Sequence, residues 1–172
     1  MQRIVVVGPP CSGKTTTARA IAQRLRLPHV ELDSLWWEPN WTEAGAERFT
    51  ERLGDVVATP AWVVDGNYFA VGASDVLHPR CDTVVWLDFP TRITARRALR
   101  RTVRRAVLRS ELWAGNREPI RYSLRPVWIL RTAFRRHPQY NREVAELSSL
   151  GHATWVRLRR PSEVAAWLRS IR

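Results

Sequence analysis

The feature that most constrains the fold of this chain is the octet 8–15, which reads Gly-Pro-Pro-Cys-Ser-Gly-Lys-Thr. It matches G-x-x-x-x-G-K-[ST], the pattern of a phosphate-binding P-loop. A continuous β-branched run at 4–7 precedes it and predicts a buried strand. Apolar residues then recur at helical spacing over 18–25. Because a strand, a glycine-rich loop and a helix follow one another, the loop predicts a phosphate site at the start of that helix.

Lys14 is the only lysine in the chain, since every other cationic side chain apart from histidine is an arginine. Its retention favours a compact ammonium on a flexible stem over a planar guanidinium. In a P-loop, Lys14 would reach the β- and γ-phosphates, and the Thr15 hydroxyl would ligate Mg²⁺. The residues expected to contact the phosphates are Gly8, Pro9, Pro10, Cys11, Ser12, Gly13, Lys14, Thr15 and Thr16.

Short apolar runs alternate with helical patterns along the rest of the chain. Further strands are predicted at 29–32, 62–64, 83–87 and 154–158. Helices are predicted at 46–57, 92–109, 126–136, 141–150 and 162–171. This alternation predicts a three-layer α/β/α fold with a five-stranded parallel sheet, for which we expect the order 2-3-1-4-5. We expect one domain over residues 1–172.

The net charge of +12 and the pI of about 11.4 favour anionic partners, which include both nucleotides and nucleic acid. The two cysteines, Cys11 and Cys81, make neither a disulfide framework nor a metal site. The chain begins almost directly with its first strand, and no apolar run approaches ~20 residues. We therefore expect a cytoplasmic protein without a signal peptide or a membrane partner, and the sequence makes no prediction of its oligomeric state.

Acidic and polar side chains follow the predicted strands at the edge where parallel sheets bind their ligands. Asp65 is expected to serve Mg²⁺ together with Thr15, the alternative being a turn aspartate. Asp33 is expected to bind an acceptor or to take a proton from its hydroxyl, the alternative being a cap. Asn67 and Tyr68 offer an amide and a phenol to the same acceptor.

These patterns resemble the nucleoside monophosphate kinase group of P-loop kinases. The resemblance rests on Trp-Val-Val-Asp-Gly at 62–66 and on the stretch 81–90, which ends in Asp-Phe-Pro. Leu-Asp-Ser-Leu-Trp-Trp at 32–37 and Asp-Gly-Asn-Tyr at 65–68 are similar to the adenylate-kinase-like branch known as topology-modulation proteins. The resemblance implies a kinase that uses ATP and Mg²⁺ to phosphorylate a nucleotide or a hydroxylated metabolite.

The resemblance also assigns roles to arginines. Arg97 would lie against the adenine ring, and Arg101 would hold ATP phosphates. Arg117 and Arg121 lie within a segment, 105–125, that we expect to form a lid over the transferring phosphoryl group. At their spacing of four they could equally line a solvated helix face.

The acceptor side departs from adenylate kinases. Asn-Tyr-Phe at 67–69 replaces their Phe-Pro-Arg, whose arginine grips the acceptor phosphate. The insert expected on this side, 34–61, is short. It contains a tryptophan-rich run at 36–41 that we expect to be a loop, in which Trp37 would stack on an acceptor ring or cap a core. Shikimate and gluconate kinases share the P-loop and an aspartate that Asp33 matches, but no shikimate or sugar-acid signature follows it.

Two other classes of function stay open. The arginine rows and the net charge of +12 fit a nucleic-acid-associated NTPase, although no helicase motif accompanies the P-loop. The same loop would also suit a nucleotide-binding regulatory module with little turnover.

Overall fold

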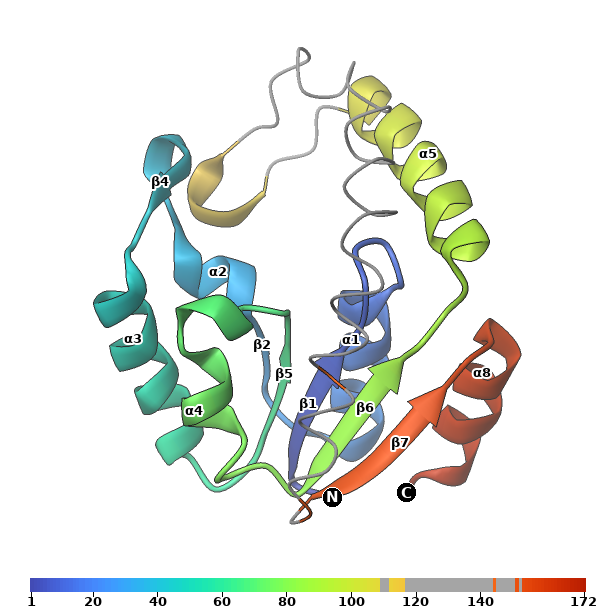
Figure 1. Cartoon of the computed structure of the whole chain (residues 1–172), viewed down its shortest axis with the longest axis horizontal. Coiled ribbons are helices and arrows are strands. Elements are labelled where there is room, and N and C mark those ends of the chain that lie inside the picture. Colours follow the sequence, from blue (N-terminus) through green and yellow to red (C-terminus); the bar gives the residue numbers. More distant parts are fainter. Residues whose placement is uncertain (109–111, 117–143, 145–150, 152) are drawn as a thin grey trace.

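The five predicted strands form one parallel sheet at the centre of the molecule (Figure 1). The computed structural model describes residues 1–108, 112–116, 144, 151 and 153–172. The sheet contains β1 (Arg3–Val7), β2 (His29–Glu31), β5 (Trp62–Asp65), β6 (Thr83–Leu87) and β7 (Thr154–Leu158). The helices are α1 (Lys14–Leu25), α2 (Leu32–Trp36), α3 (Ala46–Ala58), α4 (Ala73–Leu77), α5 (Thr91–Leu108) and α8 (Pro161–Ser170). Among the described residues there are also short strands β3 (Trp37–Glu38) and β4 (Thr42–Glu43), and 3-10 turns η1 (Pro39–Trp41), η2 (Phe69–Val71) and η3 (Trp113–Gly115).

The order of the strands in the sheet is β2-β5-β1-β6-β7, and each neighbouring pair is parallel. Counted in chain order within this sheet, the order is 2-3-1-4-5, which confirms the prediction. The strands β3 and β4 lie outside this sheet, because they pair with each other as a separate antiparallel hairpin. The P-loop therefore follows a central strand with β5 on one side and β6 on the other.

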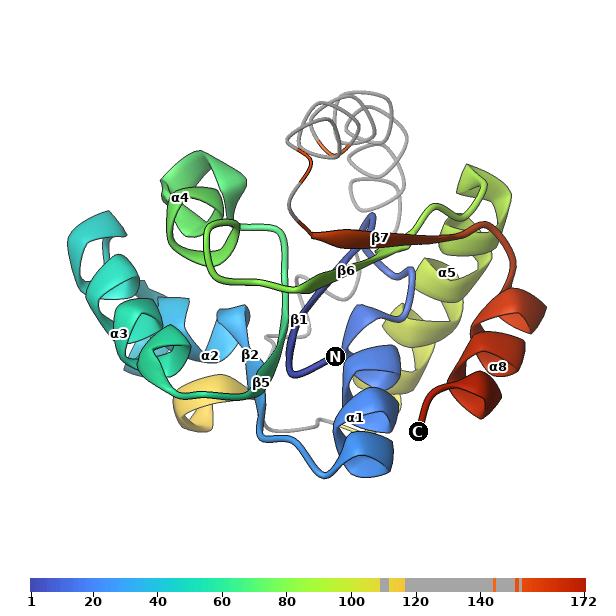
Figure 2. The ribbon, with the colours of Figure 1, turned by 90° about the horizontal axis from the view of Figure 1, so that it is seen from below.

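Both faces of the sheet are covered at its centre, which explains why β1 is apolar and buried over residues 4–7. In β1, Val5 and Val7 face the core under α3 and α4, while Ile4 and Val6 face the core under α1 and α8. Figure 2 shows α3 and α4 on one side of the sheet and α1 and α8 on the other. Successive residues of a strand point to opposite faces, so an uninterrupted valine run can fill two cores.

The tryptophan-rich segment differs from the expected loop. Its first part is the short helix α2, which places Asp33 in its first turn, and β3, η1 and β4 follow as a hairpin. Trp36 is buried and meets Phe49 of α3 edge-on at 5.6 Å between ring centroids. Apolar contact with α3 therefore orders a segment that lacks any strong local pattern.

Two further regions complete the comparison with the sequence. α4, a five-residue helix, was not predicted, because its apolar residues are too few to show a period. The helix predicted at 126–136, the helix predicted at 141–150 apart from residue 144, and most of the expected lid at 105–125 lie outside the described residues. Within the part of the chain that is described, no helix is both long and apolar enough to cross a membrane.

Candidate active site

The P-loop makes a tight turn directly after β1. Gly13 adopts φ 95°, a left-handed conformation that glycine accepts without steric cost, and α1 begins at the next residue. The Ser12 amide donates to the Pro9 carbonyl across the turn at 3.1 Å. A Cβ at Gly8 would lie 2.7 Å from Ser12 Oγ and 2.9 Å from Leu87 Cβ. Both glycines of the motif are thus required by the backbone of the turn.

Lys14 reaches back over this turn. Its ammonium donates to the carbonyls of Gly8 and Pro9 at 3.0 and 3.3 Å. Burial lowers the pKa of Lys14 below its ordinary value, and the nearby carboxylates of Asp65 and Asp33 oppose that shift. The cation therefore lies between the loop and two acids.

Asp65, at the end of β5, is buried and has a hydrogen-bond partner on each oxygen. The Thr15 hydroxyl donates to Oδ1 at 2.9 Å, and His29 Nε2 lies 2.7 Å from Oδ2. The parallel pairing of β2 with β5 brings His29 to this carboxylate. The structure thus brings together Thr15 and Asp65, the two residues expected to serve Mg²⁺, whereas His29 was not singled out by any spacing signal.

Asp33 pairs with Tyr68. The Tyr68 hydroxyl donates to Asp33 Oδ1 at 2.6 Å. Burial raises the pKa of Asp33, although the hydrogen bond from Tyr68 and the charge of Lys14 oppose the rise. Burial and the neighbouring Asp33 carboxylate raise the pKa of Tyr68 strongly, so the phenol remains a donor.

Three further predicted residues meet the P-loop. Asn67 Nδ2 donates to the Gly8 carbonyl at 2.8 Å. Arg97 of α5 donates to the Ser12 carbonyl and lies over the Phe89 ring, 5.1 Å from its centroid. One turn further, Arg101 Nη1 lies 4.0 Å from the Cys11 sulfur. The acceptor-side asparagine and the two arginines thus converge on opposite sides of one loop.

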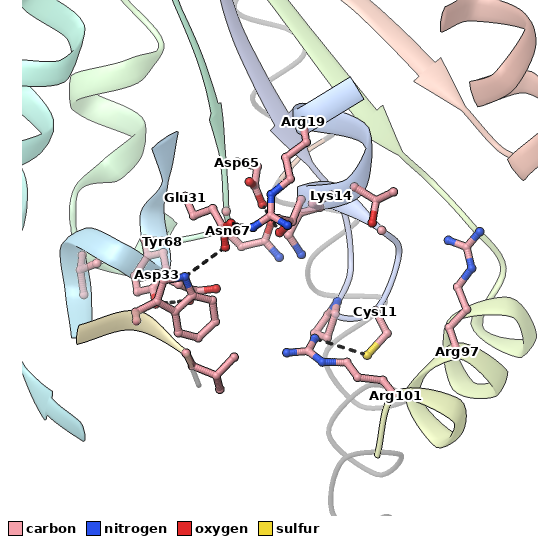
Figure 3. Close-up of a pocket in the computed structure, with 18 of the residues that line it drawn as sticks. Cys11, Lys14, Arg19, Glu31, Asp33, Asp65, Asn67, Tyr68, Arg97 and Arg101 are labelled. Carbon is pink, nitrogen blue, oxygen red and sulfur yellow. Dashed lines mark hydrogen bonds and ion pairs between the residues drawn. The ribbon is translucent and has the colours of Figure 1, made fainter. Parts of the chain in front are cut away.

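These groups surround a cavity of about 1020 Å³ (Figure 3). The predicted residues that line it are Pro10, Cys11, Gly13, Lys14, Thr15, Thr16, Asp33, Asp65, Asn67, Tyr68, Arg97 and Arg101. Three predicted loop contacts, Gly8, Pro9 and Ser12, do not line the cavity. Their carbonyls accept hydrogen bonds from Lys14 and Arg97. The cavity is large enough for a nucleotide and a small second molecule.

On the acceptor side, Trp37 does not lie where the sequence predicted. It is not among the residues that line this cavity. Instead it packs edge-on against Trp41 at 5.4 Å between centroids, and its indole hydrogen-bonds to Tyr68. The side chain thus supports Tyr68 from outside the cavity. The predicted catalytic residues Arg117 and Arg121 lie outside the described residues.

Sequence reasoning missed a second group of lining residues. Glu31 accepts from Arg19 on one oxygen and from Trp113 Nε1 on the other, the latter at 3.0 Å. Glu31 stands two residues before Asp33, a spacing that could have drawn attention to it. Trp113 follows α5 by five residues and carries no such signal, because only the fold brings it to β2.

Asn116 holds this distant segment in place. It is 5% exposed, donates from Nδ2 to the Glu38 carbonyl at 2.8 Å and accepts from the Trp41 amide at 3.0 Å. In Figure 1 the gold segment η3 accordingly lies beside α2. The segment 112–116, which follows α5, thus forms one wall of the cavity.

The donor set at Thr15 and Asp65 fits Mg²⁺. That ion usually takes one or two protein oxygens and completes its octahedron with phosphates and water. A hydroxyl and a buried carboxylate, 2.9 Å apart at the mouth of a phosphate loop, supply such oxygens. No group of three or more acidic, histidine or cysteine side chains that could hold a metal occurs among the described residues.

Comparison with solved structures concerns the fold. A shikimate kinase from Acinetobacter baumannii, solved with shikimate, superposes with a TM-score of 0.60 at 21% identity, covering 98% of this chain and 89% of that one. A gluconokinase from Sinorhizobium meliloti superposes with a TM-score of 0.52 at 19% identity over 98% and 91% of the two chains. The chain therefore has the fold of the P-loop kinases, a three-layer α/β/α architecture. At these identities the likeness concerns the fold alone.

Sequence comparisons match shorter parts of the chain. The model of the ATPase family associated with various cellular activities matches residues 4–64. A Streptomyces griseus adenylate kinase is 50% identical over 34 residues, which cover 20% of this chain and 94% of that sequence. Threonine synthase-like 1 of Mus musculus is 30% identical over 104 residues. That match covers 52% of this chain but 14% of the mouse protein.

Proposed function

We propose that this protein is an ATP-dependent kinase that phosphorylates a hydroxyl group of a small molecule. The observation that carries the proposal is the position of Lys14 between a P-loop and two acids, Asp33 and Asp65, along one cavity. The fold of the P-loop kinases supports a phosphotransferase. The adenylate-kinase-like branch remains a proposal that rests on the sequence patterns.

In the donor half, the loop amides and the start of α1 would bind the ATP phosphates. Lys14 would leave its carbonyl partners for the β- and γ-phosphates, because phosphate oxygens are stronger acceptors of a charged donor. Thr15 and Asp65 would hold Mg²⁺, which supplies charge neutralisation when bound. Arg97 and Arg101 would contact the nucleotide from α5, and catalysis would be mainly positioning and electrostatic stabilisation.

In the acceptor half, Asp33 would take the proton of the attacking hydroxyl. The acceptor oxygen would bond to the γ-phosphorus while the bond to the β-phosphate oxygen breaks, leaving ADP. A raised pKa brings Asp33 closer to the range in which a carboxylate works as a general base. Tyr68 orients this carboxylate through Oδ1, so Oδ2 remains for the acceptor. The expected lid at 105–125 with Arg117 and Arg121 would exclude water.

The nucleic-acid alternative depends on the net charge of +12 and on exposed arginines such as Arg92, Arg96 and Arg100 on α5. A polarised cavity with two acids beside the phosphate loop is not required for binding a phosphate backbone. The kinase therefore accounts for more of the geometry. A regulatory module would keep the ATP site but would not need Asp33.

The test measures ATP binding and phosphoryl transfer separately. Wild-type protein and Lys14→Ala are titrated with ATP and Mg²⁺ by calorimetry, and far-UV dichroism checks the fold of both. Transfer from γ-labelled ATP is then measured with pools of nucleoside monophosphates, nucleosides and small hydroxylated metabolites. We expect Lys14→Ala to remain folded, to weaken ATP binding and to abolish transfer. Unchanged ATP binding and turnover in this variant would refute the P-loop assignment.

A further inference from the structure

Charges are divided unevenly along the cavity. Three cations, Lys14, Arg97 and Arg101, contact the P-loop through Gly8, Ser12 and Cys11. The carboxylates of Asp33 and Glu31 lie on the opposite side, as Figure 3 shows. The phosphate-binding half is therefore cationic. The half that would receive the acceptor contains acids.

The fourth cation of the cavity is already paired. Arg19 forms an ion pair with Glu31, and the second Glu31 oxygen accepts from Trp113. Glu31 is held from two sides and is 15% exposed in its side chain, whereas Arg19 is 62% exposed. The pair is neutral as a unit, so it offers little net attraction to an anion.

Asp33 is the remaining charge in this half. Tyr68 donates to one of its oxygens, and the phenol keeps its proton because its pKa is strongly raised. No ion pair to Asp33 occurs within the described residues. A carboxylate in this position attracts hydroxyl and ammonium donors and repels a second anion.

The wall beyond these acids is largely apolar. Ala70 and Val71 come from η2 and its end, while Leu112 and Trp113 come from the segment around η3. Such a surface suits the carbon framework of a ring or a chain. The wall adds no charge that would balance an anionic substituent.

From this arrangement, and resting on the kinase function proposed above, we propose that the acceptor is a hydroxyl-bearing molecule without an anionic group. Sugars, polyols, nucleosides and amino alcohols belong to this class. With Lys14, Arg97 and Arg101 assigned to ATP, a phosphate or carboxylate on the acceptor would face Asp33, and Arg19, the fourth cation among the described lining residues, is paired with Glu31. The acceptor class thus differs from the nucleoside monophosphates.

The experiment compares acceptors that share a skeleton and differ in charge. One set contains glucose, glucosamine and gluconate, and a second contains adenosine and AMP. Two larger pools hold neutral or amine-bearing hydroxyl compounds and their carboxylated or phosphorylated counterparts. Phosphoryl transfer from γ-labelled ATP is measured with each. We expect the neutral and amine-bearing compounds to be favoured by about 10-fold or more in kcat/KM, since like charges in a desolvated site discriminate strongly.

A variant tests the physical cause. Glu31→Gln keeps an acceptor for Trp113 but frees the charge of Arg19. We expect it to raise transfer to anionic acceptors relative to neutral ones by about 3- to 10-fold, because an unpaired arginine attracts them. Glu47→Gln, which changes an exposed acid of α3, is the matched control and should leave the ratio unchanged.

The outcomes separate this inference from the proposed function. Preferred transfer to the anionic pool would overturn the acceptor class alone. Label in neither pool while ATP binding depends on Lys14 would favour the regulatory module and overturn both the kinase and the acceptor class. ATP binding that does not depend on Lys14 would overturn the kinase and the acceptor class together. Preference for the neutral pool with an altered ratio in Glu31→Gln would support the inference.

Discussion

His29 Nε2 lies 2.7 Å from Asp65 Oδ2, and the Thr15 hydroxyl donates to the other oxygen of the same carboxylate at 2.9 Å. Asp65 is 4% exposed, so its orientation depends on these two partners. The contact joins neighbouring strands, since β2 pairs with β5 at Glu31 and Asp65. His29 thereby acts as a positioning residue for the acid that we propose for Mg²⁺.

Removing this histidine should affect both stability and the use of Mg²⁺. His29→Leu leaves a buried carboxylate oxygen without a partner, which should cost about 1–3 kcal/mol in the free energy of unfolding. We also expect a higher Mg²⁺ requirement for ATP binding. Urea denaturation and calorimetric titrations of ATP at several Mg²⁺ concentrations measure the two effects. His29→Gln, which retains a donor, should recover most of the Mg²⁺ response, and failure to recover it would count against positioning.

Asp33→Asn should make the free protein no less stable near neutral pH. Burial raises the pKa of Asp33 above its ordinary value of 3.8, so the folded state binds this proton more tightly than the unfolded chain. The contribution of Asp33 to stability is therefore full below pH 3.8 and is lost as the pH rises through the folded pKa. Asparagine is neutral throughout and still accepts from Tyr68.

Urea denaturation between about pH 4 and pH 8 measures this difference. The advantage of Asp33→Asn over the wild type should shrink as the pH falls. Asp55→Asn, a change of an exposed aspartate in α3, is the control. In Asp33→Asn we also expect ATP binding to persist and phosphoryl transfer to fall by ~10²–10⁴-fold, as for a lost general base. An equal loss of ATP affinity would instead place Asp33 in the metal site.

The two arginines of α5 should differ in what they recognise. Arg97→Ala should weaken binding of ATP more than binding of inorganic triphosphate, if the side chain contacts the base. Arg101→Ala should weaken both ligands by about 10-fold or more, since a charge-assisted hydrogen bond contributes ~1.5–3 kcal/mol. Arg100→Ala, on the exposed side of the same helix, should leave both affinities unchanged.

Duplex DNA, titrated at two salt concentrations, tests the alternative for these arginines. A nucleic-acid surface would lose affinity in each variant, with the salt slope falling by about one unit for each lost phosphate contact. A clear fall in DNA affinity in the variants of Arg97, Arg100 and Arg101, with unchanged ATP binding, would reassign this helix.

Asn116→Ala should loosen the wall that η3 contributes to the cavity. The side chain is buried and bridges the Glu38 carbonyl and the Trp41 amide, so its loss should cost about 1–3 kcal/mol. Trp113 should then be held less firmly against Glu31. We expect a higher KM for the acceptor and an unchanged Kd for ATP. A selective loss of ATP affinity would show that this segment serves the nucleotide instead.

The short helix α2 and Trp37 show where sequence patterns stop being informative. The run at 36–41 contains three tryptophans, which suggested a loop with a stacking surface. In the structure Trp36 packs in the core against Phe49, and Trp37 contacts Tyr68 from outside the cavity. The tryptophan that lines the cavity is Trp113. Which ring faces the cavity depends on packing between elements, and no local period encodes that choice.

The sequence by itself determined the P-loop and the five strands, because glycine spacing and continuous apolar runs are local signals, while the neighbours of each strand in the sheet depend on the tertiary structure. Asp33 and Asp65 were predicted from their places after predicted strands, and Arg97 and Arg101 from the resemblance to adenylate kinases; all four line the cavity. Only the tertiary structure decided their partners. The contacts of His29 with Asp65, Tyr68 with Asp33 and Trp113 with Glu31 join residues 36, 35 and 82 positions apart. Such pairs form when the parallel sheet places strands side by side and when η3 packs beside β3 and α2, relations that periodicity along the chain does not contain.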